Sequence, residues 1–204
     1  MKDSKAFWDK SAPRYAKRAI SDQAAYEKKL SITQEYLQQD WSVLEFGCGT
    51  GSTAIIHSPC VRKIVAIDIS AKMLEIAQQK AKDACVDNIE FLQGTLQELA
   101  FAPESFDAVL GLNILHLLEN ADAAVAKVYA LLKPGGVFVS STALIDEMNV
   151  ALRLVIPLMQ FLGLAPHVRR FSKKELLSML TKAGFVIDKE WQPDKSSVFI
   201  VAKK

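Results

Sequence analysis

The chain has 204 residues, of which half are hydrophobic and 24% are charged, and its net charge is +2. This composition is typical of one globular domain, and so small a charge gives no electrostatic reason to expect a nucleic-acid partner. The three cysteines lack the spacing of metal ligands, so we expect a reduced, cytoplasmic protein without a metal site. We expect no secretory signal and no membrane span, because the most apolar stretch, Val150–Pro166, is short and contains Arg153 and Pro157.

Residues 3–40 are expected to form two helices, the first broken by Pro13 and the second starting near Ser21 or Asp22. The second helix has one largely apolar face, because residues of this kind recur at helical spacing. These residues are Tyr26, Leu30, Thr33 and Leu37.

A short buried strand, Val43–Phe46, runs into a turn that contains Gly47, Gly49 and Gly51. Glycine lets the backbone adopt positive φ and lets a ligand approach it closely. The helix expected to start near Ser52 points its unpaired N–H groups toward this turn. The first turn of this kind in an open α/β sheet is where nucleotide-like ligands usually bind.

The spacing of the glycines distinguishes two classes of protein. A dinucleotide-binding turn has the pattern G-x-G-x-x-G, which needs a glycine at position 52, where this chain has Ser52. The stretch V-L-E-F-G-C-G-T-G resembles instead motif I of the class I S-adenosylmethionine-dependent methyltransferases. This resemblance covers about residues 43–142 well and is weaker at both ends of the chain.

The resemblance implies that the turn holds the methionine and ribose of S-adenosyl-L-methionine, or of its product S-adenosyl-L-homocysteine. It makes Glu45 the expected partner of the cofactor's ammonium group. The other cofactor-binding residues assigned to this stretch are Phe46, Gly47, Cys48, Gly49, Thr50 and Gly51. In the small-molecule branch of the family, a segment like Phe7–Tyr15 often caps the cofactor. Tyr15, Tyr26 and Lys29 are therefore candidates to close over its methionine end, and the alternative is packing for the tyrosines and solvation for the lysine.

A second strand, Ile64–Ile67, ends in Asp68, which follows Gly47 at the distance of about 20 residues expected for a carboxylate that binds ribose hydroxyls. The alternative role for Asp68 is a charge at a helix N-terminus, because Ser70 resembles an N-cap. Ile69 and Met73 are expected to flank the adenine ring, and Met73 also fits the apolar stripe of the next helix.

A third strand, Ile89–Leu92, leads to Gln93-Gly94-Thr95-Leu96. Members of the family commonly have G-D-A here, with the acidic side chain on the adenine amino group and the next backbone N–H on the ring. Thr95 replaces that carboxylate, and a hydroxyl accepts a hydrogen bond more weakly than a charged oxygen. The backbone contact from Leu96 survives the replacement.

The fourth strand, Ser105–Gly111, is followed by Asn113 and His116 at the end where open α/β sheets bind their ligands. By the resemblance, Asn113 lies beside the cofactor and His116 faces the substrate. His116 is the candidate base if the acceptor atom is oxygen or carbon, and a histidine at a helix start or in the core is the alternative. The absence of N-P-P-(Y/F) argues against a methyltransferase of nucleic-acid bases.

The rest of the chain, from residue 121 on, continues the alternation of helices and strands. An amphipathic helix, 121–132, is stopped by Lys133–Gly136 before a fifth strand, 137–141. Residues 150–164 are apolar nearly all round and could form the wall of an apolar pocket, pack on the N-terminal helices, pair two subunits or lie on a membrane. Ser172 and Glu175 start a last helix with a capping box, and two strands, 185–191 and 198–202, suit an antiparallel hairpin at the edge of the sheet.

The sequence thus predicts one α/β domain, a Rossmann-like three-layer sandwich with a seven-stranded, mostly parallel sheet that ends in an antiparallel hairpin. Its expected parts are a helical cap (1–40), a cofactor-binding core (41–142), an apolar lid insertion (143–171) and a last helix with the hairpin (172–204). The expected function is methyl transfer to a small, apolar acceptor or a lipid, as in the branch of the ubiquinone and menaquinone methyltransferases. A non-catalytic S-adenosylmethionine-binding protein and a nicotinamide-dependent oxidoreductase remain as alternatives. We expect no nucleic-acid partner, at most peripheral membrane contact, and a monomer or homodimer.

Overall fold

The computed structural model describes residues 2–148, 155–157, 159–160 and 165–204. Its centre is a seven-stranded sheet in the order β3-β2-β1-β4-β5-β7-β6. Neighbouring strands are parallel from β3 to β5, whereas β7 runs antiparallel to both β5 and β6. The strands are β1 Ser42–Phe46, β2 Lys63–Asp68, β3 Ile89–Gln93, β4 Phe106–Leu112, β5 Leu132–Ala143, β6 Val186–Asp194 and β7 Ser197–Lys203. The predicted sheet with its antiparallel hairpin is confirmed.

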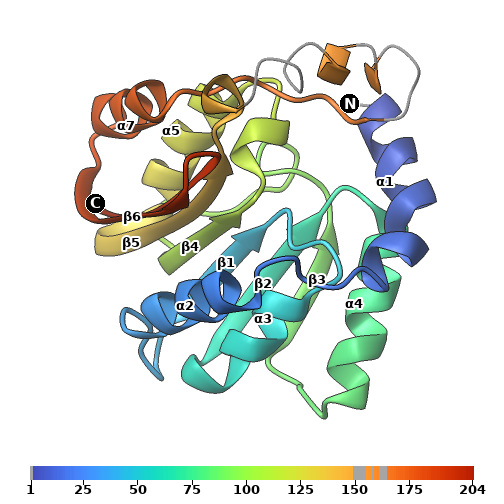
Figure 1. The fold of residues 1–204 in the computed structure, drawn as a ribbon. Coiled ribbons are helices and arrows are strands. Elements are labelled where there is room, and N and C mark those ends of the chain that lie inside the picture. The colour runs from blue at the N-terminus through green and yellow to red at the C-terminus, as the bar shows by residue number, and fades with distance from the viewer. Residues whose placement is uncertain (1, 149–154, 158, 161–164) are drawn as a thin grey trace.

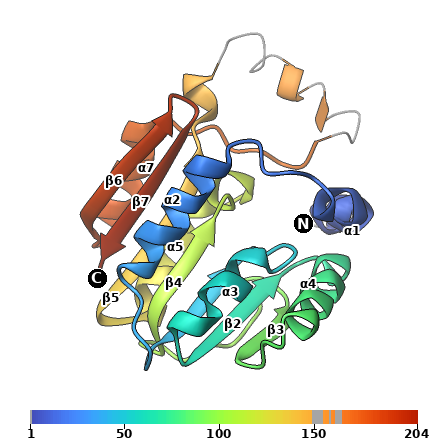
Figure 2. The same ribbon diagram turned by 60° about the horizontal axis from the view of Figure 1, so that its bottom comes forward.

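Helices cover both faces of this sheet (Figures 1 and 2). One face carries α2 Gln23–Gln34, α3 Ser52–His57 and α4 Ala71–Asp83, and the other carries α5 Ala121–Leu131 and α7 Lys173–Lys182. Outside this sandwich, α1 Lys2–Ala16 packs on α4. Short 3₁₀ turns complete the described elements: η1 Ser58–Cys60, η2 Leu115–Leu117 and η3 Ile145–Glu147.

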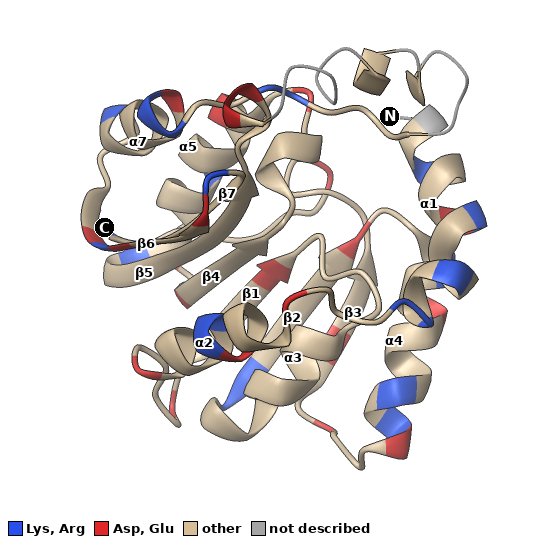
Figure 3. Ribbon diagram, in the orientation of Figure 1, with Lys and Arg blue, Asp and Glu red and all other residues tan. Residues whose placement is uncertain are grey.

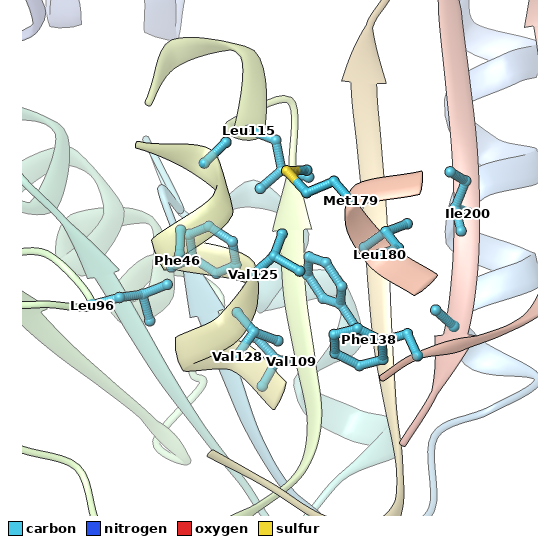
Figure 4. Close-up of a cluster of buried hydrophobic side chains, with 14 of the residues drawn as sticks. Phe46, Leu96, Val109, Leu115, Val125, Val128, Phe138, Met179, Leu180 and Ile200 are labelled. Carbon is cyan, nitrogen blue, oxygen red and sulfur yellow. The ribbon is translucent and has the colours of Figure 1, made fainter. Parts of the chain in front are cut away.

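Apolar side chains fill the space between the sheet and each helical layer. Toward α5 and α7, Phe46 and Phe138 stack with their ring centroids 6.2 Å apart, and Val125 and Leu180 lie in the same cluster (Figure 4). A second cluster, which includes residues of α2, α3 and α4, covers the opposite face. The central strand β1 is therefore buried on both sides, which explains its nearly continuous apolar sequence.

Two local predictions are corrected by the structure. α1 is not broken at Pro13 but continues to Ala16, because a proline this close to the helix end removes only one ladder hydrogen bond. The residues Lys133–Gly136 do not precede the fifth strand, because β5 already starts at Leu132. They bulge from the ladder with β4, where Phe106 pairs with Leu132 and Ala108 pairs with Val137.

Most of the expected apolar segment at 150–164 lies outside the described residues, since 149–154, 158 and 161–164 are not described. The boundaries predicted for the cap, core, lid and hairpin therefore stay predictions. Within the described ranges, no helix combines the length and apolar character needed to cross a membrane.

Candidate functional site

Side-chain alternation along the strands gathers the polar residues of the site on one face of the sheet. Successive residues of a strand point to opposite faces, so Glu45 shares a face with Val43, and Asp68 with Ala66. Val43 and Ala66 belong to the cluster under α2, α3 and α4. The same rule brings Ser141 of β5 to this face, in register with Leu112 of β4. Figure 3 shows acidic residues at the carboxyl ends of the central strands β1 and β2.

The three glycines of the turn after β1 serve different physical needs. All three have positive φ, of 66°, 55° and 72° for Gly47, Gly49 and Gly51. A Cβ on Gly47 would lie 2.6 Å from the side chain of Ile114, and a Cβ on Gly51 would lie 2.8 Å from Cβ of Ala77. A Cβ on Gly49 would meet only Cε1 of Tyr15, at 3.9 Å. Gly47 and Gly51 therefore allow close packing, whereas Gly49 leaves open space above the turn.

Hydrogen bonds hold this turn in place from both neighbouring elements. The backbone N–H of Cys48 donates to the carbonyl of Ile67 in β2 at 3.0 Å, and Cys48 itself is buried. Nζ of Lys80 in α4 donates to the hydroxyls of Thr50 and Ser52, both at 3.0 Å. The turn is thus pre-formed, which lowers the entropic cost of binding a ligand there.

Asp68 links the turn to the end of β2. Its Oδ2 accepts from the backbone N–H of Gly49 at 2.9 Å, and its Oδ1 accepts from that of Ser70 at 2.9 Å. A carboxylate has about four acceptor sites, so these bonds leave it capacity for a further donor. Burial raises the pKa of Asp68, while the N–H groups of Ser70 and Gly49 oppose that rise. The carboxylate therefore fits a pair of neighbouring hydroxyl groups, such as those of a ribose.

Glu45 is a buried acid with a carboxyl oxygen that has no hydrogen-bond partner. Its side chain is 3% exposed, and its Oε2 has no hydrogen-bond partner. Burial, with a smaller contribution from the negative charge of Asp68, raises the pKa of Glu45 to about 8. A buried carboxyl group without a partner is costly, and an incoming cation would relieve that cost. The orphaned oxygen therefore fits the ammonium group of the expected cofactor.

The N-terminal helix is fastened over this site by a carboxylate. Oδ1 of Asp9 accepts from the hydroxyl of Ser70 at 2.6 Å and from the backbone N–H of Lys72 at 3.2 Å, at the start of α4. The same helix places Tyr15 beside Gly49. Tyr15 stays 47% exposed, and its ring packs edge-on against Trp8 with the ring centroids 6.1 Å apart. A cap over the cofactor is consistent with this arrangement and stays a prediction.

The loop expected to bind adenine is held by a reciprocal pair of hydrogen bonds that the sequence analysis did not predict. The backbone N–H of Thr95 donates to Oε2 of Glu98 at 3.0 Å, and the N–H of Glu98 donates to Oγ1 of Thr95 at 3.2 Å. Leu96 and Met73 are buried, with 3% and 2% exposure, whereas Ile69 is half-buried. The Thr95 hydroxyl therefore fixes the loop, and the nearby carboxylate belongs to Glu98. The spacing T-x-x-E is a known signal for such pairs and could have revealed it.

A chain of hydrogen bonds joins Lys29 to the ends of β4 and β5. Nζ of Lys29 donates to Oγ of Ser141 at 3.0 Å, and that hydroxyl donates to Oδ1 of Asn113 at 3.2 Å. Asn113 has a φ of 57°, and its backbone N–H donates to the carbonyl of Ser141 at 2.7 Å. Lys29 and Asn113, two predicted site residues, are thus brought together through Ser141, which the sequence reading did not select.

His116 lies in η2, at the substrate end of β4, but its contacts are structural. Its Nδ1 accepts from the backbone N–H of Ala143 at 3.4 Å, and its carbonyl accepts from the N–H of Arg169 at 2.7 Å. Burial lowers the pKa of His116 to about 4. A neutral imidazole that accepts at Nδ1 carries its proton on Nε2, so the ring donates from that nitrogen. Its assignment as a catalytic base stays a prediction.

Comparison with known proteins agrees with this geometry. The family described as "Methyltransferase domain" matches residues 43–136. The chain is 35% identical over 109 residues to an uncharacterized methyltransferase, YcgJ, of Bacillus subtilis, covering 53% of this chain and 43% of the relative. It is 39% identical over 101 residues to the demethylmenaquinone methyltransferase of Lactococcus lactis, covering 47% of this chain and 39% of the relative. The chain therefore spans well under two thirds of the length of these two relatives.

A solved structure extends the agreement to the fold. The S-adenosylmethionine-dependent methyltransferase from Mesorhizobium loti superposes with a TM-score of 0.73 at 20% identity, covering 90% of this chain and 99% of that one. This likeness confirms the predicted Rossmann-like arrangement.

The open space at Gly49 leads to a first prediction, tested by replacing Gly49 with alanine. A Cβ there projects into the cradle, so the affinity for S-adenosylhomocysteine should fall about tenfold or more, and isothermal titration calorimetry measures it. Gly135→Ala is the matched control, because Gly135 also has positive φ (78°) and no atom within 4 Å of an added Cβ. Both variants should lose stability by roughly 1–2 kcal/mol, but only Gly49→Ala should lose affinity. Equal affinity of the two variants would contradict the cradle.

The unpartnered Glu45 predicts a pH-dependent affinity. Because the pKa of this carboxyl is about 8 in the free protein, it is protonated at pH 6–7 and must lose its proton to meet an ammonium group. The affinity for S-adenosylhomocysteine should therefore rise with pH, by up to about tenfold per unit, between pH 6 and 8. In Glu45→Gln this dependence should vanish, and the affinity should be low at every pH. A wild-type affinity that is constant across this range would exclude Glu45 as the ammonium partner.

The bond between Asp9 and the start of α4 predicts how firmly α1 is held. Asp9→Ala should speed hydrogen exchange of the α1 amides and weaken S-adenosylhomocysteine binding by about threefold to tenfold, because Tyr15 loses its position. Lys10→Ala, at an exposed position on the same helix, is the control and should change neither quantity. If Asp9→Ala leaves both exchange and affinity unchanged, α1 has no capping role.

Proposed function

We propose that the chain is a class I S-adenosylmethionine-dependent methyltransferase that transfers the cofactor's methyl group to a small-molecule acceptor, and the matching family model and the methyltransferase relatives support this. The observation that carries this proposal is the pairing of the Gly49 turn with Asp68, next to the unpartnered oxygen of Glu45. The open backbone at Gly49 and the carboxylate of Asp68 match a ribose. The buried acid Glu45 matches an ammonium group of the same ligand.

The residues of this chain supply mainly binding and orientation. S-adenosylmethionine brings a methyl group on a positively charged sulfur, so little covalent chemistry is asked of the protein. Asp68 and Gly49 would hold the sugar, Glu45 the ammonium group, and the loop at Thr95 and Leu96 the base. Such positioning can contribute about 7–11 kcal/mol to the reaction. A site built from fixed hydrogen-bond partners, without a prominent nucleophile, is consistent with this division of work.

The candidate base of the site, His116, is poorly suited to accept a proton. An oxygen or carbon acceptor needs a base, and His116 is the residue that we assign to that role. Its lowered pKa keeps the ring neutral at pH 7, as a base must be, but also makes it a poor proton acceptor. An acceptor that reacts as a neutral amine or an already ionised group would need no strong base here.

The branch of the family and the acceptor are part of the proposal. The demethylmenaquinone methyltransferase of Lactococcus lactis is among the relatives, which supports a place near the small-molecule and lipid branch. Its aligned part is less than half of its length, so its own acceptor is not carried over to this chain. A non-catalytic cofactor-binding protein is the alternative. A nicotinamide enzyme is disfavoured because Ser52 occupies the position of the third glycine.

Ligand-induced thermal stabilisation tests the cofactor. S-adenosylhomocysteine should raise the melting temperature of the protein, and NAD should not. Asp68→Ala removes a charged acceptor for two hydroxyl groups and should weaken binding of S-adenosylhomocysteine about 100-fold, with Asp68→Asn intermediate. Urea unfolding of both variants controls for their stability. A shift with NAD alone, or an unchanged shift in Asp68→Ala, would overturn the site.

Catalysis is tested separately, by incubating the protein and labelled S-adenosylmethionine with a cell extract. Label should appear in the small-molecule or lipid pool, and Asp68→Ala should abolish it. A protein that binds the cofactor but labels no pool would support the non-catalytic alternative.

A further inference from the structure

A pocket of about 310 Å³, lined by both polar and apolar residues, opens beside the expected cofactor site, between the start of α2 and the carboxyl ends of β4, β5 and the β6–β7 hairpin. Its wall includes Lys29 from α2, Asn113 and Ser141 from β4 and β5, and Asp194 and Ser197 from the hairpin. Neither Glu45 nor the glycines of the turn line it. The volume lies at the small end of the range for ligand sites and suits a molecule of about one ring.

Lys29 is the one cationic residue among the residues that line this pocket, which also include Asp22 and Asp194. It donates to one partner, the hydroxyl of Ser141, and forms no ion pair with a carboxylate among the described residues. An ammonium group has three N–H donors, so two remain for a ligand. Ser141 is fully buried, which holds the first contact in a fixed place. A half-buried lysine that no carboxylate contacts directly is costly to keep, and an anionic ligand in contact with it would offset part of that cost.

The two acidic residues at the rim are occupied elsewhere. Oδ1 of Asp22 caps α2 by accepting from the N–H of Ala25 at 2.9 Å. Oδ1 of Asp194 accepts from the N–H and the hydroxyl of Ser196 within the hairpin turn. Both residues are exposed, whereas Lys29 is half-buried, and all three line the pocket. Their charges favour the ammonium form of Lys29 and disfavour a multiply charged anion in the pocket.

We propose that this pocket is the acceptor subsite of the proposed methyltransferase, and that it takes a small carboxylic acid whose carboxylate binds Lys29. One ammonium group with hydroxyl and amide neighbours matches a singly charged carboxylate. The acceptor's nucleophilic atom would then lie toward Asn113, at the end of β4. Such an acceptor would be more polar than the one expected from the sequence, and this inference rests on the proposed function.

The carboxylate of the cofactor's methionine is the competing occupant. The charges near Lys29 are those of Asp22 and Asp194, whereas the charge near Glu45 is that of Asp68. The ammonium and carboxylate groups of one amino acid lie close together, so one methionine end would be expected to couple these two sites. Tyr26, which lines the pocket with Lys29, also feels the charge of Glu45, so the two sites adjoin. The affinity for S-adenosylhomocysteine measured in the tests below distinguishes the two occupants.

The first test uses Lys29→Met, with Lys28→Met as the matched control, because Lys28 is on the same helix but lies over the ring of Trp191. 4-Hydroxybenzoate and its neutral amide, 4-hydroxybenzamide, are titrated into the S-adenosylhomocysteine complex. The acid should bind at least tenfold more tightly than the amide in wild type and Lys28→Met, and Lys29→Met should remove that difference. The affinity for S-adenosylhomocysteine should stay within threefold in both variants.

The second test needs no prior choice of acceptor. Labelled product formed from a small-molecule extract should be retained by an anion exchanger at pH 7 and released at pH 2, where a carboxylate is protonated but a phosphate is still charged. Lys29→Met should lower that labelling at least tenfold.

Three results would overturn the inference while leaving the proposed function intact: equal binding of acid and amide, a labelled product that is neutral or held at pH 2, or a tenfold loss of S-adenosylhomocysteine affinity in Lys29→Met. The last would assign Lys29 to the cofactor's own carboxylate. Absence of label from every pool would instead overturn the proposed function, and this inference with it.

Discussion

The hydrogen bond from the Gly49 N–H to Oδ2 of Asp68 is the contact on which the site depends. It joins the turn after β1 to the end of β2, the two central strands that are parallel and in register. The other oxygen of Asp68 holds the N–H of Ser70, whose hydroxyl in turn binds Asp9 of α1. One carboxylate therefore aligns the turn, the start of α4 and, through Ser70, the N-terminal helix. A ligand that bridges the turn and Asp68 would meet parts that are already in place.

Charge is distributed over this face in two separate groups. Glu45 and Asp68 form an acidic centre with an unpartnered oxygen, and Lys29 forms a cationic centre that is joined to the β5 end through Ser141. Oε2 of Glu45 has no hydrogen-bond partner, and the ammonium group of Lys29 has donors to spare. The low dielectric of a buried site makes such groups selective for ligands of opposite charge. A cationic amino group at the first and an anionic group at the second would complete both.

The sequence predicted the fold and the core of the site, because these follow from local signals. Glycine spacing, strand patterns and the distance from Gly47 to Asp68 identify the turn and its carboxylate, and S-x-x-E identifies the start of α7. The contacts of Asp9 with Ser70, of Glu98 with Thr95 and of Lys29 with Ser141 were missed or only partly foreseen. Two of these three contacts join residues 61 and 112 positions apart, so no local pattern encodes them. The predicted break at Pro13 and the predicted turn at 133–136 ahead of the fifth strand were both wrong. Pro13 removes one ladder hydrogen bond without ending α1, and pairing with β4 already includes Leu132 in β5.

A crystal structure of the protein with S-adenosylhomocysteine would test the account most directly. We predict that both ribose hydroxyls lie within hydrogen-bond distance of the Asp68 carboxylate. The ligand's ammonium group should contact Glu45, and its methionine and ribose part should pass over Gly49. A sugar bound elsewhere, with Asp68 in contact only with the N–H groups of Gly49 and Ser70, would contradict the account.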